Sequence, residues 1–311
     1  MNMPTAGAAA PARPPSPPLG EGPRGPAPGK VEPSRIGLYV FLLAAAAFFL
    51  LPLYVMVVTS LKGMPEIRTG DIFALPLAPG FDAWTKAWAT ACTGLNCNGI
   101  SVGFWNSVRI VIPSIIIPVL LSSWTGYVLS FWRAKGAEVI FGVLLVGAFI
   151  PYQVFLYPMV RGFAMVGLSG SLAAIVTVHA IFALPVLTLL FRNFFVGLPI
   201  DLFKAARIDG ANFVQIYLFV MMPMAVPMVA VAVIMQAAGV WNDFLFGAVF
   251  AGPENQPMTV QLNNLVNSPF GDKEYNVNMA ATMLTALLPL AIFFFSGRWF
   301  VRGIAAGAIK G

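Results

Sequence analysis

Charged side chains are scarce in this sequence of 311 residues, where Asp, Glu, Lys and Arg together make up 10%. Hydrophobic residues make up 59%, and the mean hydropathy is +0.82. A soluble globular domain carries about 25% charged residues. The composition therefore excludes a soluble domain and indicates an integral membrane protein.

Motifs for enzyme chemistry are also missing. The sequence has no Walker phosphate loop, no dinucleotide-binding glycine fingerprint and no histidine pair. The single histidine, His179, lies inside an apolar run, where an interhelix hydrogen bond is the favoured interpretation. One histidine and two cysteines argue against a metal site. We therefore predict no catalytic residues, no metal ligands and no cofactor in this chain.

Nucleic-acid binding is not indicated either. The net charge is +6, but no basic cluster with interleaved aromatic residues occurs. Most of the charge follows the pattern of membrane topology. If the N-terminal tail is cytoplasmic, twelve of the eighteen Lys and Arg residues fall on the inside. The positive-inside rule then places both termini in the cytoplasm of a multi-pass protein of a cell (inner) membrane.

Long apolar runs are what the sequence contains instead. Each run reaches the roughly 20 residues that a helix needs to cross the hydrocarbon core. The runs are too long and too uniformly apolar for barrel strands of about 10 alternating residues. We predict an all-α fold with six transmembrane helices, at 36–60, 104–131, 139–158, 172–194, 221–248 and 278–298.

Three regions follow from this pattern. Residues 1–35 contain ten prolines and five glycines, which predicts a disordered cytoplasmic tail. The membrane domain is predicted over 36–298, with a large inside connection at 197–223 after the fourth span. A cytoplasmic C-terminal tail is predicted over 299–311.

Both cysteines, Cys92 and Cys97, lie in the predicted outside segment between the first two spans. Thiols outside a bacterial inner membrane can oxidise, and this spacing would close a small loop. A disulfide and two free structural thiols are both open interpretations.

The connection 197–223 combines helix and turn signals. Pro199 suits the first turn of a short helix, and Ala205 and Ala206 favour helix while adding little bulk. Gly210 permits a turn that other residues would strain. The predicted structure is a compact elbow on the inside of the membrane.

Two more residues extend this elbow. Asp209 can cap the helix that follows the glycine, and Ala211 is another small side chain. Small residues would let the surface of another protein approach the backbone closely. From the residues alone, the elbow is either a docking surface or an ordinary connection between two helices.

The order Ala205-Ala206, Asp209-Gly210-Ala211 and then Pro223 resembles the signature loop of ATP-binding-cassette importer permeases. More narrowly, the chain resembles the second membrane subunit of maltose-type carbohydrate importers. Further matching segments follow in chain order: Thr59-Ser60-Leu61-Lys62, Trp241-Asn242-Asp243-Phe244, Pro257-Met258-Thr259-Val260-Gln261-Leu262 and Gly303 to Gly311. The resemblance covers nearly everything after residue 36.

The resemblance implies a six-span permease that pairs with a homologous permease and two cytoplasmic ATPase subunits, which bind ATP and Mg²⁺. An external sugar-binding protein would deliver the sugar. The loop would form a coupling helix seated in a cleft of the ATPase, and the tail from Gly303 would reach towards the ATPase dimer. Contact residues implied by the loop are Lys204, Ala205, Ala206, Asp209, Gly210 and Ala211. The paired cysteines also look similar to permeases for glucose or mannose.

One residue departs from the family pattern. Lys204 stands where the family usually has Glu. A buried charge of the wrong sign costs several kcal/mol unless a complementary group meets it. One hypothesis is a matched acidic residue in the ATPase cleft. The alternative is local neutralisation by Asp201, three positions earlier on the helix.

The substrate path is less defined. Trp241, Asn242 and Asp243 stand together in the fifth predicted span, where a carboxylate usually faces the bundle interior or a wet cavity. An indole face and two polar groups suit a sugar, but helix packing and gating are the favoured roles. The alternative function is a secondary transporter driven by an ion gradient, which uses titratable groups near the midplane. Asp243 and His179 are its candidates.

Overall fold

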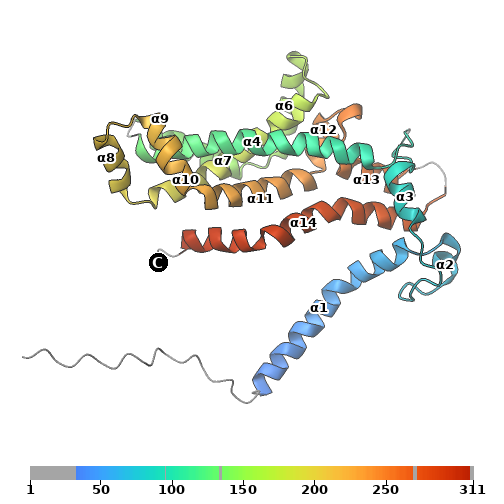
Figure 1. The fold of residues 1–311 in the computed structure, drawn as a ribbon. Coiled ribbons are helices and arrows are strands. Elements are labelled where there is room, and N and C mark those ends of the chain that lie inside the picture. The colour runs from blue at the N-terminus through green and yellow to red at the C-terminus, as the bar shows by residue number, and fades with distance from the viewer. Residues whose placement is uncertain (1–32, 95, 133–134, 269–271, 309–311) are drawn as a thin grey trace, which may run out of the picture. The chain divides into compact units, whose positions relative to one another are not determined.

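The computed structural model describes residues 33–94, 96–132, 135–268 and 272–308. Within these ranges every regular element is a helix (Figure 1). The predicted tail 1–35 lies almost wholly outside them. The chain divides into two units, Met1–Pro52 and Leu53–Gly311, which are considered separately.

The first unit contributes most of helix α1 (Pro33–Ser60). Residues 35–60 are long and apolar enough to cross a membrane. Large side chains such as Phe41, Leu43 and Phe49 are exposed. Because lipid tails are as apolar as these side chains, such a surface is stable inside a bilayer.

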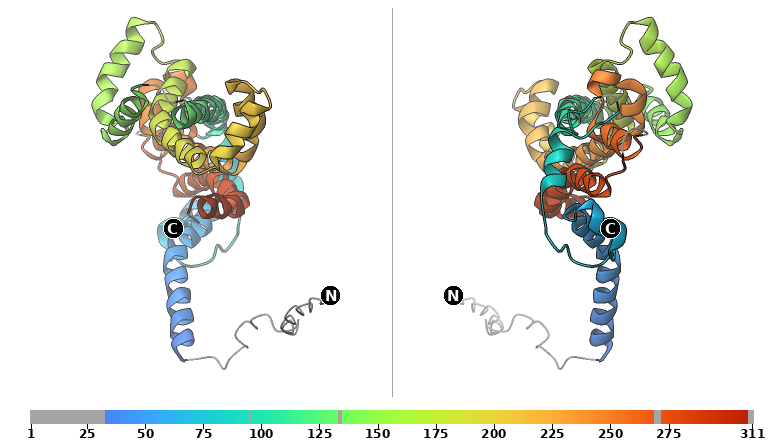
Figure 2. Two further views of the ribbon diagram at one scale, coloured as in Figure 1. Left: turned by 90° about the vertical axis from the view of Figure 1, so that its left-hand side faces the viewer. Right: turned by 90° about the vertical axis from the view of Figure 1, so that its right-hand side faces the viewer.

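Four long helices form the bundle of the second unit: α4 (Ser101–Phe131), α7 (Leu172–Val196), α11 (Val226–Asn242) and α14 (Tyr275–Ala308). Helix α4 packs along α7, while α11 contacts both α4 and α14 (Figures 1 and 2). At Gly126 of α4, a Cβ atom would lie 2.8 Å from Cβ of Phe191 on α7. Only glycine therefore permits this close helix pair, as is common in membranes.

The predicted third span is a broken helix. Helix α5 (Ala137–Phe149) and helix α6 (Gln153–Met165) meet at 104°. Ile150 is extended, with ψ at 125°, and it precedes Pro151. A residue before proline is disfavoured in the helical region because its backbone clashes with the proline ring. The span predicted over 139–158 therefore consists of two helices that meet at Pro151.

The predicted fifth span also differs. The chain runs through α9 (Phe213–Ile216), the π-helix η1 (Tyr217–Met221) and α10 (Met222–Met224), and then turns by 75° into α11. Pro227 lies just past this turn, at the start of α11. Helix α11 ends at Asn242, so the continuous helix predicted over 221–248 is wrong at both ends.

Four described helices can each cross a membrane by length and composition, or six if each bent pair is one span. The all-α membrane fold is confirmed, with the predicted six as the upper count. Helix α14 runs beyond the predicted end at residue 298 as far as Ala308. The predicted tail 299–311 therefore begins as a continuation of this helix, and residues 309–311 lie outside the described ranges.

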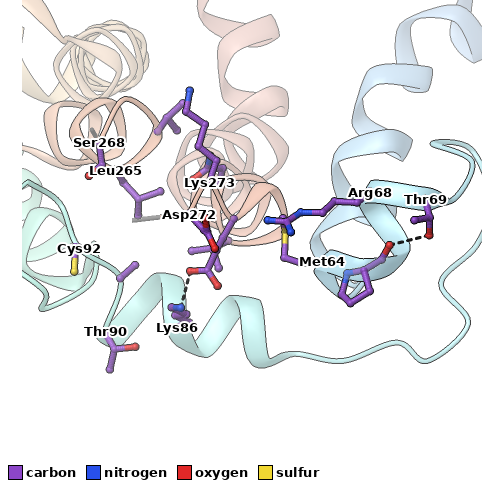
Figure 3. A pocket seen from close by; sticks show the side chains of 16 residues that line it. Met64, Arg68, Thr69, Lys86, Thr90, Cys92, Leu265, Ser268, Asp272 and Lys273 are labelled. Atoms are coloured by element: carbon purple, nitrogen blue, oxygen red, sulfur yellow. Dashed lines mark hydrogen bonds and ion pairs between the residues drawn. The ribbon is translucent and has the colours of Figure 1, made fainter. Parts of the chain in front are cut away.

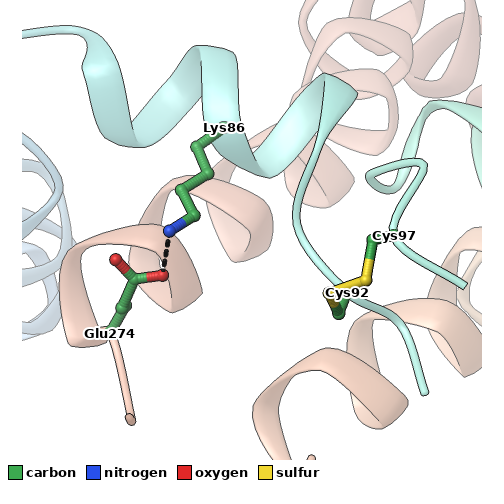
Figure 4. Close-up of a disulfide and its surroundings, with 4 residues drawn as sticks. All are labelled: Lys86, Cys92, Cys97 and Glu274. Carbon is green, nitrogen blue, oxygen red and sulfur yellow. Dashed lines mark ion pairs between the residues drawn. A yellow bond between two sulfur atoms is a disulfide. The ribbon is translucent and has the colours of Figure 1, made fainter. Parts of the chain in front are cut away.

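Short elements gather at the end of the bundle opposite to helix α8 (Ile200–Ile208), and this end is called the far end (Figure 1). They are α2 (Met64–Thr69), α3 (Asp82–Ala89), α12 (Leu245–Phe250), the 3₁₀ turn η2 (Pro253–Asn255) and α13 (Met258–Val266). Cys92 and Cys97 form a disulfide in the link between α3 and α4 (Figure 4).

Candidate coupling loop and polar clusters

Residues 197–223 form an elbow between α7 and α11. Pro199 is the N-cap of α8, and Asp209 is its C-cap. The chain then turns at Gly210, whose φ is +86°. This left-handed conformation strains residues with a Cβ atom. A short helix and a glycine turn therefore occur where the sequence predicts them.

Asn212, and not Asp209, caps the helix after the turn. Oδ1 of Asn212 accepts the Gln215 N–H at 2.9 Å, and Oε1 of Gln215 accepts the Asn212 N–H at 2.9 Å. This reciprocal pair is a capping box, which satisfies two helix amides that otherwise lack partners. The cap predicted for Asp209 is wrong because the turn at Gly210 leaves Asp209 on the preceding helix.

Aromatic side chains fasten the elbow to the end of α4. Phe203 is 8% exposed, and its ring stacks on Phe131 with centroids 4.8 Å apart. The Tyr127 hydroxyl donates to the Phe213 carbonyl at 2.8 Å, and the hydroxyls of Ser123 and Tyr217 lie 2.7 Å apart. Packed side chains and two hydrogen bonds therefore connect the elbow directly to α4.

The opposite face of α8 is open. Lys204, Ala205, Asp209 and Gly210 are exposed, and Ile208 is 85% exposed. The open face of α8 therefore combines apolar surface at Ala205 and Ile208 with charged groups at Lys204 and Asp209.

The remaining two predicted contact residues, Ala206 and Ala211, are half-buried and pack against the aromatic cluster. The six predicted residues therefore divide into four on the open face and two that pack inwards.

Lys204 has a local partner. Its Nζ lies 3.3 Å from Oδ1 of Asp201, and the two side chains are 63% and 87% exposed. An exposed ion pair contributes about 0.2–1 kcal/mol, so the contact is weak. Neutralisation of Lys204 by Asp201 thus has a geometric basis, while both side chains remain accessible to another protein.

Trp241 is a packing residue. It is 1% exposed, and its Nε1 donates to the Thr285 carbonyl of α14 at 3.0 Å. Its ring also packs edge-on against Phe104 of α4. The indole is enclosed in this structure, which agrees with the favoured packing role, and sugar contact by Trp241 stays a prediction. Its neighbour Asn242 is exposed and donates to its own helix at Ala238.

Asp243 joins three segments at the far end. Its carboxylate accepts the N–H groups of Phe246 at 3.3 Å and Gly247 at 3.0 Å, at the start of α12. Its carbonyl accepts the Thr259 hydroxyl at 2.6 Å. Nε2 of His179 lies 3.8 Å from Oδ2, which is longer than a hydrogen bond. The interhelix contact favoured for His179 exists, but not as a direct hydrogen bond.

Aromatic contacts around Phe246 of α12 reach the break between α5 and α6 and the neighbouring helix α7. Tyr152, at the break between α5 and α6, packs edge-on against Phe246 with centroids 5.2 Å apart. Phe182 of α7 stacks on Phe246, and His179 packs on it edge-on. The Phe246 ring therefore connects α12 to α7 and to the break between α5 and α6.

Sequence reasoning missed the residues that hold the last far-end loop. Asn106 of α4 donates to the carbonyls of Glu254 and Gln256. Oγ of Ser107 accepts the Met258 N–H at 2.8 Å. The available signal was the pair of adjacent polar residues, Asn106 and Ser107, inside an otherwise apolar run.

Gln261 completes this attachment. Its Oε1 accepts the Gly103 N–H at 2.9 Å, a buried contact between α13 and α4. A Cβ atom at Gly103 would lie 2.7 Å from the same oxygen. The far-end loop is therefore fixed to α4 by three separate hydrogen-bonding side chains.

A hollow of about 760 Å³ opens at the far end, lined by parts of α2, α3, α13 and α14 (Figure 3). It contains Arg68, Lys273 and Asp272, and Lys86 pairs with Glu274 at 2.5 Å (Figure 4). Both signs of charge line this hollow, which suits a polar protein surface more than an apolar ligand.

Known proteins with similar sequences share one kind of role. The chain is 33% identical to the alpha-glucoside transport system permease protein AglG of Rhizobium meliloti over 224 residues, which cover 70% of this chain and 58% of that protein. It is 28% identical to the glucose import system permease protein GlcU of Saccharolobus solfataricus over 275 residues, covering 86% and 92%.

A solved structure shares the fold. A chain of a bacterial ABC transporter involved in the import of alginate matches with a TM-score of 0.69 at 20% identity, covering 88% of this chain and 99% of that one. The family described as binding-protein-dependent transport system inner membrane component matches residues 118–309. Because this match includes the elbow and most of the bundle, the chain belongs to that family of inner membrane transport components.

Proposed function

We propose that this chain is one of the two membrane subunits of an ATP-driven carbohydrate importer. In the assembled importer it would form half of the translocation path. The family match and the named relatives support this role. The gradient-driven transporter that the sequence left open has no support among these comparisons.

The observation that carries the proposal is the construction of the elbow. Helix α8 presents an open face with Ala205 and Ile208, while its inner face is locked onto α4 by Phe203. A partner protein that binds the open face of α8 can therefore displace the membrane helices. If partners on the two sides of the membrane each favour one of two conformations of this chain, ATP hydrolysis and transport are coupled.

The proposed complex contains this chain, a homologous permease, two ATPase subunits and an external sugar-binding protein. ATP and Mg²⁺ bind to the ATPase subunits. The α8 end faces the cytoplasm, together with both termini, and the far end faces outwards. In this orientation the binding protein docks at the far end, where the hollow with mixed charges lies.

The proposed substrate is a hexose such as glucose or mannose, or a glycoside built from one. The relative that imports glucose and the relative for alpha-glucosides support this class. Of the predicted path residues, Asn242 is the one that stays exposed for a hydroxyl, whereas Trp241 is enclosed.

The test is uptake of labelled glucose, mannose and maltose into vesicles that contain the purified complex and its binding protein. ATP inside the vesicles should drive uptake, and a proton or sodium gradient without ATP should not. Gradient-driven uptake by the single chain would contradict the proposal.

A matched pair of variants then tests the elbow. Ala205→Trp blocks the open face of α8, whereas Ala89→Trp adds the same bulk to an exposed position of α3 at the far end. We expect Ala205→Trp to release the ATPase subunits or abolish ATP-driven uptake, and Ala89→Trp to retain assembly with the ATPase. Equal retention of ATPase and uptake by both variants would remove the elbow from the coupling role.

A further inference from the structure

Lys62 is a buried lysine without a counter-charge in the described structure. It lies in the second unit, just after the end of α1, and it is 4% exposed. Its Nζ donates to the Asp71 carbonyl at 2.9 Å. Among the described residues, no carboxylate oxygen lies within 4.0 Å of this nitrogen. An ammonium group has three donors, and a buried charge is costly unless it is paired.

The chain around Lys62 is held in place. Oγ of Ser60 accepts the Trp84 Nε1–H at 3.1 Å, and Nδ2 of Asn276 donates to the Lys62 carbonyl at 3.1 Å. These contacts tie the end of α1 to α3 and α14. Neighbouring segments therefore fix the backbone of Lys62, and this backbone holds the side chain in its buried position.

A cavity of about 250 Å³ lies beside the lysine. Lys62 and Thr59 supply polar groups to its wall, and Val55, Ile67 and Met279 supply apolar ones. The volume is below the roughly 300–1,000 Å³ of a site for drug-sized molecules. It suits one oxyanion with a short apolar extension.

The position of Lys62 relative to the apolar run of α1 indicates which oxyanion lies near it. The apolar run of α1 ends at Val58, and Lys62 follows one helical turn later. Basic residues at this distance from an apolar run lie at the level of the lipid headgroups. Tyr54 and Tyr275 are 38% and 47% exposed nearby in the chain fold, as in the aromatic belt of membrane proteins.

We propose that this cavity binds the phosphate of a phospholipid, with Lys62 as the cation that holds it. The apolar wall then contacts the first carbons of an acyl chain. The Asp71 carboxylate also borders the cavity, but its Oδ1 accepts the Phe73 N–H at 2.9 Å and the residue is exposed. The inference rests on membrane insertion and is independent of the transported substrate.

The test uses the assembled complex, purified in mild detergent, stripped of loose lipid and titrated with phosphatidylglycerol under native mass spectrometry. We expect one tightly held lipid per copy of this chain in the wild type. Lys62→Met should weaken its retention roughly tenfold or more. Lys273→Met, which removes an exposed lysine near the far-end hollow, should retain the lipid.

A second variant, Met279→Trp, tests the proposal even if Lys62→Met fails to fold. It fills the cavity and leaves Lys62 in place. It should also lose the lipid while the complex stays assembled. Retention of the lipid by Lys62→Met or by Met279→Trp would overturn the proposal.

Two further outcomes would overturn it. Displacement of the lipid by inorganic phosphate at millimolar concentration would show a site for free phosphate. If Asp71→Asn lowers the melting temperature of the complex as much as Lys62→Met does, the counter-charge is the chain's own carboxylate. A smaller loss of stability in Asp71→Asn supports the lipid phosphate.

Discussion

The two ends of the bundle are held together by different kinds of contact. At the α8 end, the elbow rests on aromatic faces such as Phe203 on Phe131, with two hydroxyl hydrogen bonds beside them. At the far end, buried side chains connect separate segments through directional hydrogen bonds, as in Gln261 to Gly103 and Ser107 to Met258.

This difference has a mechanical meaning. Aromatic faces stay in contact over a range of offsets, whereas a hydrogen bond weakens steeply when its angle or length changes. The α8 end can therefore follow a moving partner without losing its packing. The segments of the far end move together, because a shift of one segment alone would break its buried hydrogen bonds to the next.

The largest effect is expected when the aromatic anchor of the elbow, Phe203, is removed. Phe203→Ala should cost about 3–5 kcal/mol of packing around the elbow, since the buried ring leaves a cavity. We expect ATP-driven uptake to be lost while the far-end hydrogen bonds persist, as measured by uptake and by hydrogen exchange of residues 253–266.

The matched control is Phe219→Ala, because Phe219 is 75% exposed on the π-helix. It should leave uptake and exchange nearly unchanged. If both variants lose uptake equally, the effect belongs to the whole connection and not to the anchor.

The far end is tested by Gln261→Leu. This change leaves the buried Gly103 N–H without its acceptor, which costs about 1–3 kcal/mol. The melting temperature of the complex should fall, with exchange increasing at residues 253–266. Asn263→Leu, at an exposed position of the same helix, should have a smaller effect. An equal drop in both variants would refute the proposed rigidity of this contact.

The disulfide has a more local effect. Cys97→Ser opens a loop with a sequence separation of 5, for which loop-closure entropy predicts about 2 kcal/mol. The Gly99 N–H to Ala91 and Thr93 N–H to Asn96 hydrogen bonds also hold this link. Limited proteolysis should therefore speed up between α3 and α4, with uptake retained. Loss of uptake would place the disulfide in the transport mechanism.

The smallest structural effect is expected at Lys204. Lys204→Glu replaces a weak ion pair with Asp201 by a like-charge pair, a change of about 1 kcal/mol in the isolated chain. If the ATPase cleft carries the matched acidic residue, ATP-linked uptake should fall by about tenfold or more. The control Asp201→Asn removes the local partner only. Equal uptake in wild type and Lys204→Glu would exclude the matched acidic residue.

The apolar runs predicted the fold class, because the length of a run and its lack of charge are direct consequences of the bilayer. The apolar runs alone do not show the breaks, because hydropathy averages over a window and is the same for a straight helix and a bent pair. Pro151 carried the signal, but a proline can either bend a helix or end it. In the structure Ile150 is extended, so the proline ends α5 here.

Some parts of the candidate site could be predicted from the sequence and others could not, because only some of them depend on local sequence. The turn at Gly210 follows from a local backbone requirement, and the Asn212 cap was readable from Gln215 three residues later. The enclosure of Trp241 by α4 and α14 depends on segments distant in sequence. No local pattern contains that information, so the choice between packing and substrate contact required the structure.

The proposed coupling requires that the open face of α8 binds an ATPase subunit. The most direct measurement is site-specific photo-cross-linking from position 208, where the native Ile208 is 85% exposed, in the assembled complex. We expect a cross-link to the ATPase whose yield changes when ATP is bound. The same probe at position 219 on the π-helix should not reach it. A complex that hydrolyses ATP and imports sugar without any cross-link from position 208 would contradict the claim.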